Sequence, residues 1–117
     1  MVAVTKERVE GMDEFIFVGN VSDIPSGEAK VIDINRKSVA VFNVKDKFFA
    51  ISNLCPHEGG TLAEGHVKGF VVTCPWHDLA FDVRNGQGTD GGGYCVGSYE
   101  VRLDGNQVYV GPRRRAV

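Results

Sequence analysis

The sequence has no long apolar run. No stretch approaches the roughly 20 apolar residues of a membrane-spanning helix, and the opening MVAVTKERVEGMDE has no apolar core like that of a signal peptide. Basic residues are not in excess either, with 13 Lys and Arg against 15 Asp and Glu. We therefore expect a cytoplasmic protein without a membrane or nucleic-acid partner. The one charge run, Arg113-Arg114-Arg115, is interpreted as a solvated tail.

Segments with a helical period are also missing, and Thr61 to Glu64 could form one helical turn at most. Short apolar segments with turn signals between them predict strands instead. These strands are expected at residues 15–18, 29–34, 38–44, 47–51, 70–73, 79–83, 99–103 and 107–110. Lys45-Asp46 and Asn85-Gly86 are expected to be turns. The fold class predicted for the 117 residues is all-β, a single domain built as an antiparallel sandwich or small barrel.

Cysteine is scarce, and three residues in a chain without a secretory signal do not suggest a disulfide framework. Two of the three cysteines occur in short boxes, Cys55-Pro56-His57 and Cys74-Pro75-Trp76-His77. Each box pairs one thiolate ligand with one imidazole ligand, and 16 residues separate His57 from Cys74. Two such pairs can close around one metal centre. Tetrahedral Zn²⁺ accepts this donor set, although zinc modules usually place both Cys before both His.

The mixed order of the two boxes resembles the Rieske [2Fe–2S] proteins, in which two Cys hold one iron and two His hold the other. The resemblance implies that Cys55 and Cys74 bind the buried iron, and that His57 and His77 bind the outer iron. It also implies a β base with an inserted cluster-binding subdomain at about residues 52–81.

The chain departs from the high-potential respiratory Rieske proteins at four positions. Gly60 and Trp76 stand where those proteins have a bracing disulfide, and Leu79 and Phe81 stand where they have hydroxyl donors to sulfur. Fewer hydrogen bonds to the sulfurs lower the reduction potential. The departures therefore indicate a low-potential ferredoxin, similar to those of dioxygenase systems, with a potential of roughly −150 mV.

The resemblance implies an electron carrier with no catalytic residues of its own. Its expected partners are a flavin-dependent reductase and a terminal oxygenase or other redox enzyme, and we expect a monomer. Two alternatives stay open at this point, a small redox subunit of a nitrite reductase-like complex and a zinc-binding interaction module.

Residues around the boxes have less specific roles. Leu54, Pro56, Pro75 and Trp76 are expected to supply an apolar docking rim, although Trp76 could equally pack over the cluster loop. We expect Cys95 to be a buried, inert thiol, and His66 to lie in a loop near the cluster without binding it.

Overall fold

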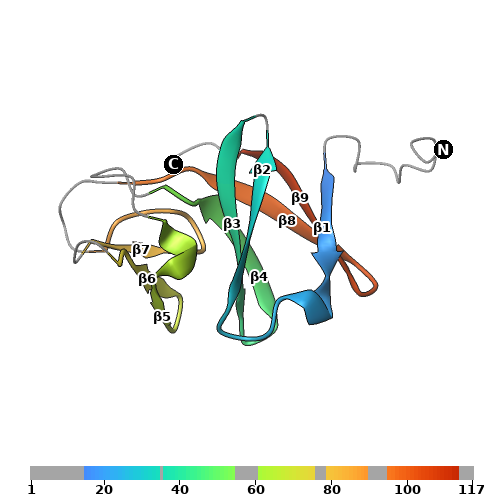
Figure 1. The fold of residues 1–117 in the computed structure, drawn as a ribbon, viewed down its shortest axis with the longest axis horizontal. Helices are drawn as coiled ribbons and strands as arrows, with labels where there is room; N and C mark the ends of the chain where they lie inside the picture. The colour runs from blue at the N-terminus through green and yellow to red at the C-terminus, as the bar shows by residue number, and fades with distance from the viewer. Residues whose placement is uncertain (1–14, 35, 55–60, 76–78, 90–94, 114–117) are drawn as a thin grey trace.

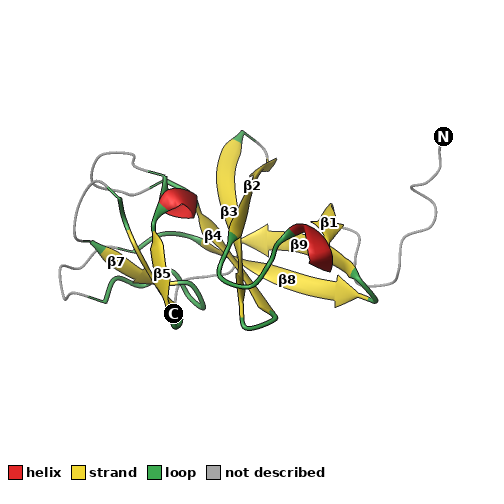
Figure 2. Cartoon of the chain, turned by 60° about the horizontal axis from the view of Figure 1, so that its bottom comes forward, coloured by secondary structure: helices red, strands yellow, loops and turns green. Residues whose placement is uncertain are grey.

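The computed structural model describes residues 15–34, 36–54, 61–75, 79–89 and 95–113. Nine strands and two short 3₁₀ helices make up this part of the chain (Figures 1 and 2). The elements are β1 (Ile16–Asn20), η2 (Val21–Asp23), β2 (Ala29–Ile34), β3 (Lys37–Val44), β4 (Lys47–Ser52), η3 (Leu62–Glu64), β5 (His66–Lys68), β6 (Val71–Thr73), β7 (Ala80–Asp82), β8 (Ser98–Asp104) and β9 (Gln107–Arg113). No helix among the described residues is long and apolar enough to cross a membrane.

Six strands form one antiparallel sheet in the order β1-β9-β8-β4-β3-β2, which we call the base. The predicted all-β class is confirmed. The expected turn at Lys45 and Asp46 joins β3 to β4, and both residues have positive φ, 52° and 70°. Two successive positive φ values match the twist of a tight hairpin, so the turn fixes the register in which Val44 faces Lys47.

The base is nearly closed on itself because its two edge strands, β1 and β2, approach each other. The Lys30 side chain on β2 donates a hydrogen bond of 2.9 Å to the Val18 carbonyl on β1. Gly19 leaves room for this contact, since a Cβ at that position would lie 3.0 Å from the Lys30 nitrogen. One side chain thus bridges a seam that backbone pairing leaves open.

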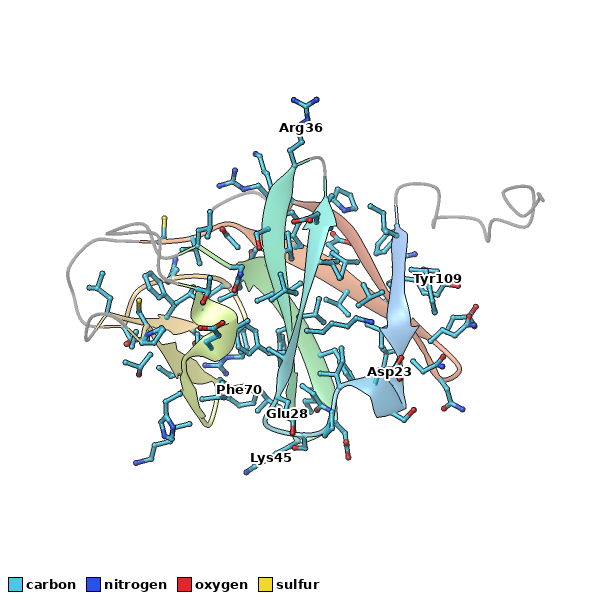
Figure 3. The ribbon with its side chains drawn as sticks, viewed as in Figure 1. Asp23, Glu28, Arg36, Lys45, Phe70 and Tyr109 are labelled. Atoms are coloured by element: carbon cyan, nitrogen blue, oxygen red, sulfur yellow. The ribbon has the colours of Figure 1, made fainter. Side chains whose placement is uncertain are left out.

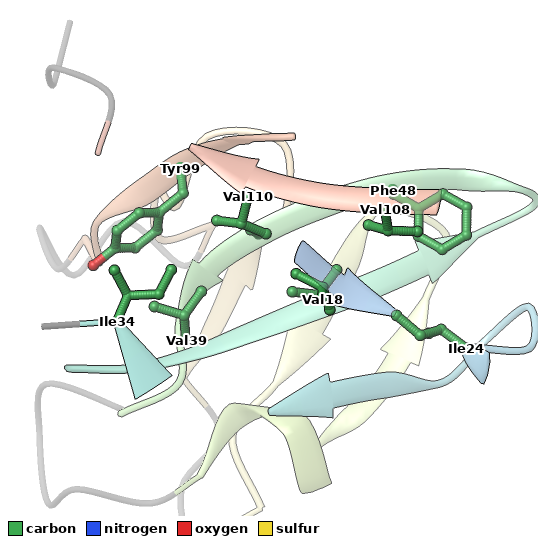
Figure 4. Close-up of a cluster of buried hydrophobic side chains, with 10 residues drawn as sticks. Val18, Ile24, Ile34, Val39, Phe48, Tyr99, Val108 and Val110 are labelled. Atoms are coloured by element: carbon green, nitrogen blue, oxygen red, sulfur yellow. The ribbon is translucent and has the colours of Figure 1, made fainter. Parts of the chain in front are cut away.

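Strands β3 and β4 are buried on both faces, which explains their nearly continuous apolar sequence. Val39 and Val41 point into the core of the base, whereas Ala40 and Phe42 point to the opposite side. The base core consists of Val18, Ile24, Ile34, Val39, Val41, Phe48, Ala50, Tyr99, Val108 and Val110 (Figure 4). The second core consists of Ala40, Phe42, Val44, Ile51, Leu62, Val72, Cys74, Phe81 and Val83.

A smaller antiparallel sheet, β5-β6-β7, lies against the outer side of β3 and β4 and shares the second core (Figure 1). Each of its strands has three residues. The sequence predicted β6 and β7 but missed β5, because His66 to Lys68 is too short for an alternating pattern to be recognised. The predicted helical turn after Thr61 is η3.

Candidate metal centre

The first ligand box follows an asparagine whose polar groups are all engaged. Asn53 is 3% exposed, and its side-chain nitrogen donates to the Ser38 hydroxyl at 3.0 Å while its Oδ1 accepts from the Ala63 N–H at 2.8 Å. Its backbone N–H donates to the Ser38 carbonyl at 2.9 Å, and its carbonyl accepts from the Leu62 N–H at 2.6 Å. Asn53 therefore ties the end of β4 to β3 and to η3 at once.

One residue further on, Leu54 and Thr61 form an isolated antiparallel bridge. The bridge closes the chain between them into a loop that contains Cys55 and His57. Residues 55–60 lie outside the described part of the chain, so the structure gives the base of this loop and not its ligands.

The second ligand box has the same arrangement at its base. Strand β6 ends at Thr73, which pairs with Ala80 of β7, and the Cys74 N–H then donates to the Leu79 carbonyl at 2.8 Å. Cys74 and Leu79 therefore stand at the base of a hairpin loop. Trp76 and His77, which the sequence places in that loop, lie outside the described residues.

Cys74 is the predicted ligand that the structure describes. It is 3% exposed and packs in the second core with Leu62, Val72 and Phe81. A buried sulfur at the base of a loop fits the iron that two thiolates would hold away from water, as the resemblance to Rieske proteins implies. Phe81 is fully buried and Leu79 partly buried, and neither side chain can donate a hydrogen bond to a sulfur.

A third segment packs beside the small sheet. The turn predicted at Asn85-Gly86 is present, and Gly86 has φ of +80°. A Cβ on Gly86 would collide with the Val96 carbonyl, and the Val96 N–H donates to the Gly86 carbonyl at 2.8 Å. The prediction that Cys95 is buried was wrong, because Cys95 bridges to Gln87 at the edge of the structure and is exposed.

The prediction for His66 also needs correction. His66 is exposed, but it begins strand β5 and pairs with Thr73, the residue before Cys74. Gly65 permits this approach, since a Cβ there would collide with the Thr73 carbonyl. The residue lies in a strand next to the second box, and the short strand rather than a loop sets its position.

Asp82 and Arg84 form an ion pair at the end of β7. Arg84 donates to both carboxylate oxygens of Asp82 at 3.0 and 2.8 Å, and its guanidinium carbon lies 4.4 Å from the centre of the Phe70 ring. The side-chain hydrogen bond from Arg84 lowers the pKa of Asp82, although partial burial opposes this shift. Phe70 in turn meets Phe49 of β4 edge-on at 5.8 Å, so the stack connects β7 to the base.

Apolar side chains next to both boxes face solvent. Leu54 is 48% exposed and immediately precedes Cys55, and Pro75 is exposed directly after Cys74. Pro56 and Trp76, the other members of the predicted rim, lie outside the described residues. Within the described part, no group of three or more His, Cys, Asp and Glu could hold a metal, as expected when three of the four predicted ligands are not described.

The sequence reasoning missed Asn53. The signal in the sequence was a single amide side chain between the apolar strand at residues 47–51 and the first box. A buried amide needs hydrogen-bond partners, so its position there indicates a buried hydrogen-bond network.

Comparison with known proteins identifies the family. The pattern of the Rieske [2Fe-2S] domain matches residues 14–94. The ferredoxin component of an alkene monooxygenase system from Xanthobacter autotrophicus is 31% identical over 99 residues, which cover 84% of this chain and 81% of that protein.

Solved structures agree with this assignment. The ferredoxin of carbazole 1,9a-dioxygenase from Nocardioides aromaticivorans superposes with a TM-score of 0.79 at 31% identity, covering 84% of this chain and 97% of that one. A chain from a complex of reduced oxygenase and oxidized ferredoxin in carbazole 1,9a-dioxygenase superposes with a TM-score of 0.81 at 28% identity, covering 89% and 98%. A candidate nitrite reductase small subunit from Mycobacterium tuberculosis, at 22% identity and a TM-score of 0.77 over 88% and 96%, shares the fold.

The zinc alternative has no support in these matches, because the family pattern is that of a [2Fe-2S] domain. The chain belongs to the Rieske [2Fe–2S] domain family, as a ferredoxin-type electron carrier with one [2Fe–2S] cluster and no catalytic activity of its own.

Proposed function

We propose that Cys55, His57, Cys74 and His77 hold the cluster and that this chain delivers single electrons to a terminal oxygenase. The observation that carries the ligand assignment is the matched pair of loop bases. The Leu54–Thr61 bridge closes one loop and the bond from Cys74 N–H to the Leu79 carbonyl closes the other. Each loop contains one Cys-His box.

The bound cluster supplies one-electron chemistry. The residues of this chain hold it and limit its contact with water. The second core surrounds Cys74 with apolar side chains, and Asn53 holds the end of β4 from which the first loop starts. We include residues 52–81 in a cluster-binding subdomain of one domain that spans the chain.

Iron and acid-labile sulfide analysis tests the ligands. Replacing any of Cys55, His57, Cys74 or His77 by Ala should deplete the cluster severely. Cys95→Ala and His66→Ala are matched controls, one a thiol bridged to Gln87 and one an imidazole in strand β5, and both should keep full iron. Full occupancy in the Cys74→Ala protein would contradict the assignment.

The proposed electron acceptor rests on the relatives. Two of the proteins compared above are ferredoxins of an alkene monooxygenase and a carbazole dioxygenase system, and one structure contains both an oxygenase and a ferredoxin. We propose a flavin-dependent reductase as the donor, and a monomeric carrier in the cytoplasm, where thiolates stay reduced.

We place the docking surface at the exposed apolar rim beside the boxes. Leu54 and Pro75 leave apolar surface in water, which suits small, transient electron-transfer interfaces. Leu54→Ser should slow electron transfer to a purified oxygenase without moving the potential. Leu103→Ser is the matched control, because Leu103 is equally exposed, at 49%, but lies at the far end of the base. Equal slowing by both variants would argue against this rim.

The nitrite reductase alternative is distinguished by assembly. A redox subunit would co-purify with a large catalytic partner, whereas the proposed carrier would elute alone and reduce an added oxygenase.

A further inference from the structure

A pocket opens at one end of the base core. It has a volume of about 460 Å³ and is lined by Ile16, Ile34, Lys37, Tyr99, Gly111, Pro112 and Arg113. We call it the end pocket. Figure 4 shows Tyr99 beside Ile34 at this end of the core, and Ile24 and Phe48 at the opposite end. Ligands of β-barrels commonly bind in such openings, in cavities of about 300 to 1,000 Å³.

Strand pairing explains why these residues meet. Ile34 of the base core pairs with Lys37 across the β2–β3 hairpin, and Val110 of the core pairs with Ile16 of β1. Directly paired residues project from the same face of a sheet. Lys37 and Ile16, the pairing partners of Ile34 and Val110, therefore lie at the rim of the end pocket. Ile16 remains 44% exposed there.

Arg113 reaches the same face through a bulge. Val101 pairs with Val110 and Tyr99 pairs with Arg113, so three steps along β9 match two steps along β8. Without the extra residue, alternation would turn Arg113 to the outer face. A bulge re-aims side chains in this way, and here it turns the Arg113 side chain to the face that carries Tyr99.

The Arg113 guanidinium is seated against the backbone. A Cβ built on Gly97 would lie 2.7 Å from Arg113 Nε and 3.0 Å from its Cζ. A larger residue at position 97 would therefore displace the Arg113 guanidinium from this place. Arg113 is exposed, as expected of a solvated residue, but it ends β9 and lines the end pocket, and Arg114 and Arg115 lie outside the described residues.

The chemistry of the lining is cationic and apolar at once. Lys37 and Arg113 carry positive charge, none of the lining residues is acidic, and Ile16, Ile34 and Pro112 supply apolar walls. Among the described residues, the side chains of Lys37, Tyr99 and Arg113 have no hydrogen-bond or ion-pair partner. Arginine binds carboxylates through two parallel hydrogen bonds, and the Tyr99 hydroxyl can donate another.

We infer that the end pocket binds a small organic monocarboxylate with an apolar body, such as an arene carboxylate. The carboxylate meets Arg113, Lys37 and the Tyr99 hydroxyl, and the apolar body rests on Ile16, Ile34 and Pro112. The site shares no residue with the proposed cluster ligands, so its test does not depend on electron transfer.

Isothermal titration of the cluster-loaded full chain with benzoate tests the inference. Benzoate should bind saturably with one site per chain, whereas acetate, which lacks the ring, and benzamide, which lacks the charge, should each bind at least about tenfold more weakly. Absence of saturable benzoate binding, or equal binding of acetate or benzamide, would overturn the site.

Variants localise the binding. Arg113→Gln and Gly97→Ala should each weaken benzoate binding about tenfold, the second without any change of charge. Arg36→Gln is the matched control, because Arg36 neighbours Lys37 but points away from the base (Figure 3). Equal weakening by Arg36→Gln would mean that only net charge matters and would overturn the site. An unchanged visible spectrum and melting temperature should show that each variant is folded.

Discussion

The base and the small sheet are built on different principles. The base has strands of five to eight residues, and its core is made largely of aliphatic side chains held by long ladders. The small sheet has strands of three residues and is joined to the base by the shared second core, the Asn53 bonds and the stack of Arg84, Phe70 and Phe49. The base is therefore held by its own long ladders, whereas the small sheet depends on contacts with the base.

Removal of the iron should give the largest difference in stability between the base and the small sheet. Chelation under reducing conditions should speed amide hydrogen exchange in β5, β6 and β7, while β3, β4 and β8 keep slow exchange, because ladders in the base do not involve the cluster. Hydrogen exchange with mass spectrometry measures both regions in one sample. If the base loses protection to the same extent, the two regions unfold as one unit and the comparison fails.

Two buried asparagines provide a matched pair of substitutions. Asn43 in the base is 2% exposed, donates to the Ile24 carbonyl and accepts from the Asp46 N–H, both at 2.7 Å. Asn53 has the same number of side-chain bonds beside the first ligand loop. Each Asn→Ala change should lower the free energy of unfolding by about 2 kcal/mol, because buried groups lose their partners.

The two variants should differ in cluster retention. Asn53→Ala should release iron faster to a chelator than the wild type, whereas Asn43→Ala should release it at the wild-type rate. Absorbance in the visible region follows the release over time. Equal rates in both variants would show that Asn53 stabilises the fold without positioning the ligand loop.

Hydroxyl groups introduced near Cys74 should raise the reduction potential, whereas a hydroxyl introduced in the base core should not change it. Leu79→Ser with Phe81→Tyr would supply donors near Cys74, and hydrogen bonds to sulfur raise the potential. Phe48→Tyr adds the same hydroxyl to the base core and should leave the potential unchanged. Voltammetry measures the shift, and a wild-type midpoint above roughly +100 mV would contradict the low-potential assignment.

The smallest effect is expected from the ion pair on the small sheet. The pKa of Asp82 is lowered in the folded protein by the hydrogen bond from Arg84. A lowered folded-state pKa stabilises the fold above the unfolded-state pKa, near 3.8, and this stabilisation disappears as the pH falls through the folded-state value.

Asp82→Asn should therefore reduce stability slightly at neutral pH and leave it unchanged in strong acid. Urea unfolding of both proteins across this pH range checks the sign, and Asp46→Asn, at an exposed turn of the base, is the control. A constant difference at every pH would exclude the ion pair as its cause.

The sequence by itself determined most of the strands and the residue types available in the two ligand boxes. Residues 29–34 are predicted with the bounds of β2, and the turn at Lys45 and Asp46 lies where expected. Such features follow from local rules, since alternation, turn residues and paired Cys-His boxes can be read within a few positions. The predicted low potential rests on local information of the same kind, because Leu79 and Phe81 have no donor in any fold, and it stays a prediction until the potential is measured.

Only the tertiary structure decided which face or edge each residue occupies. The apolar run of β3 did not reveal that Val41 and Phe42 serve two different cores. Exposure of Cys95 depends on its pairing with Gln87 at an edge, and the turn of Arg113 into the end pocket depends on a bulge opposite Tyr99. Pairing register joins residues far apart in the chain, and one residue of slip reverses every face, so no local pattern contains this information.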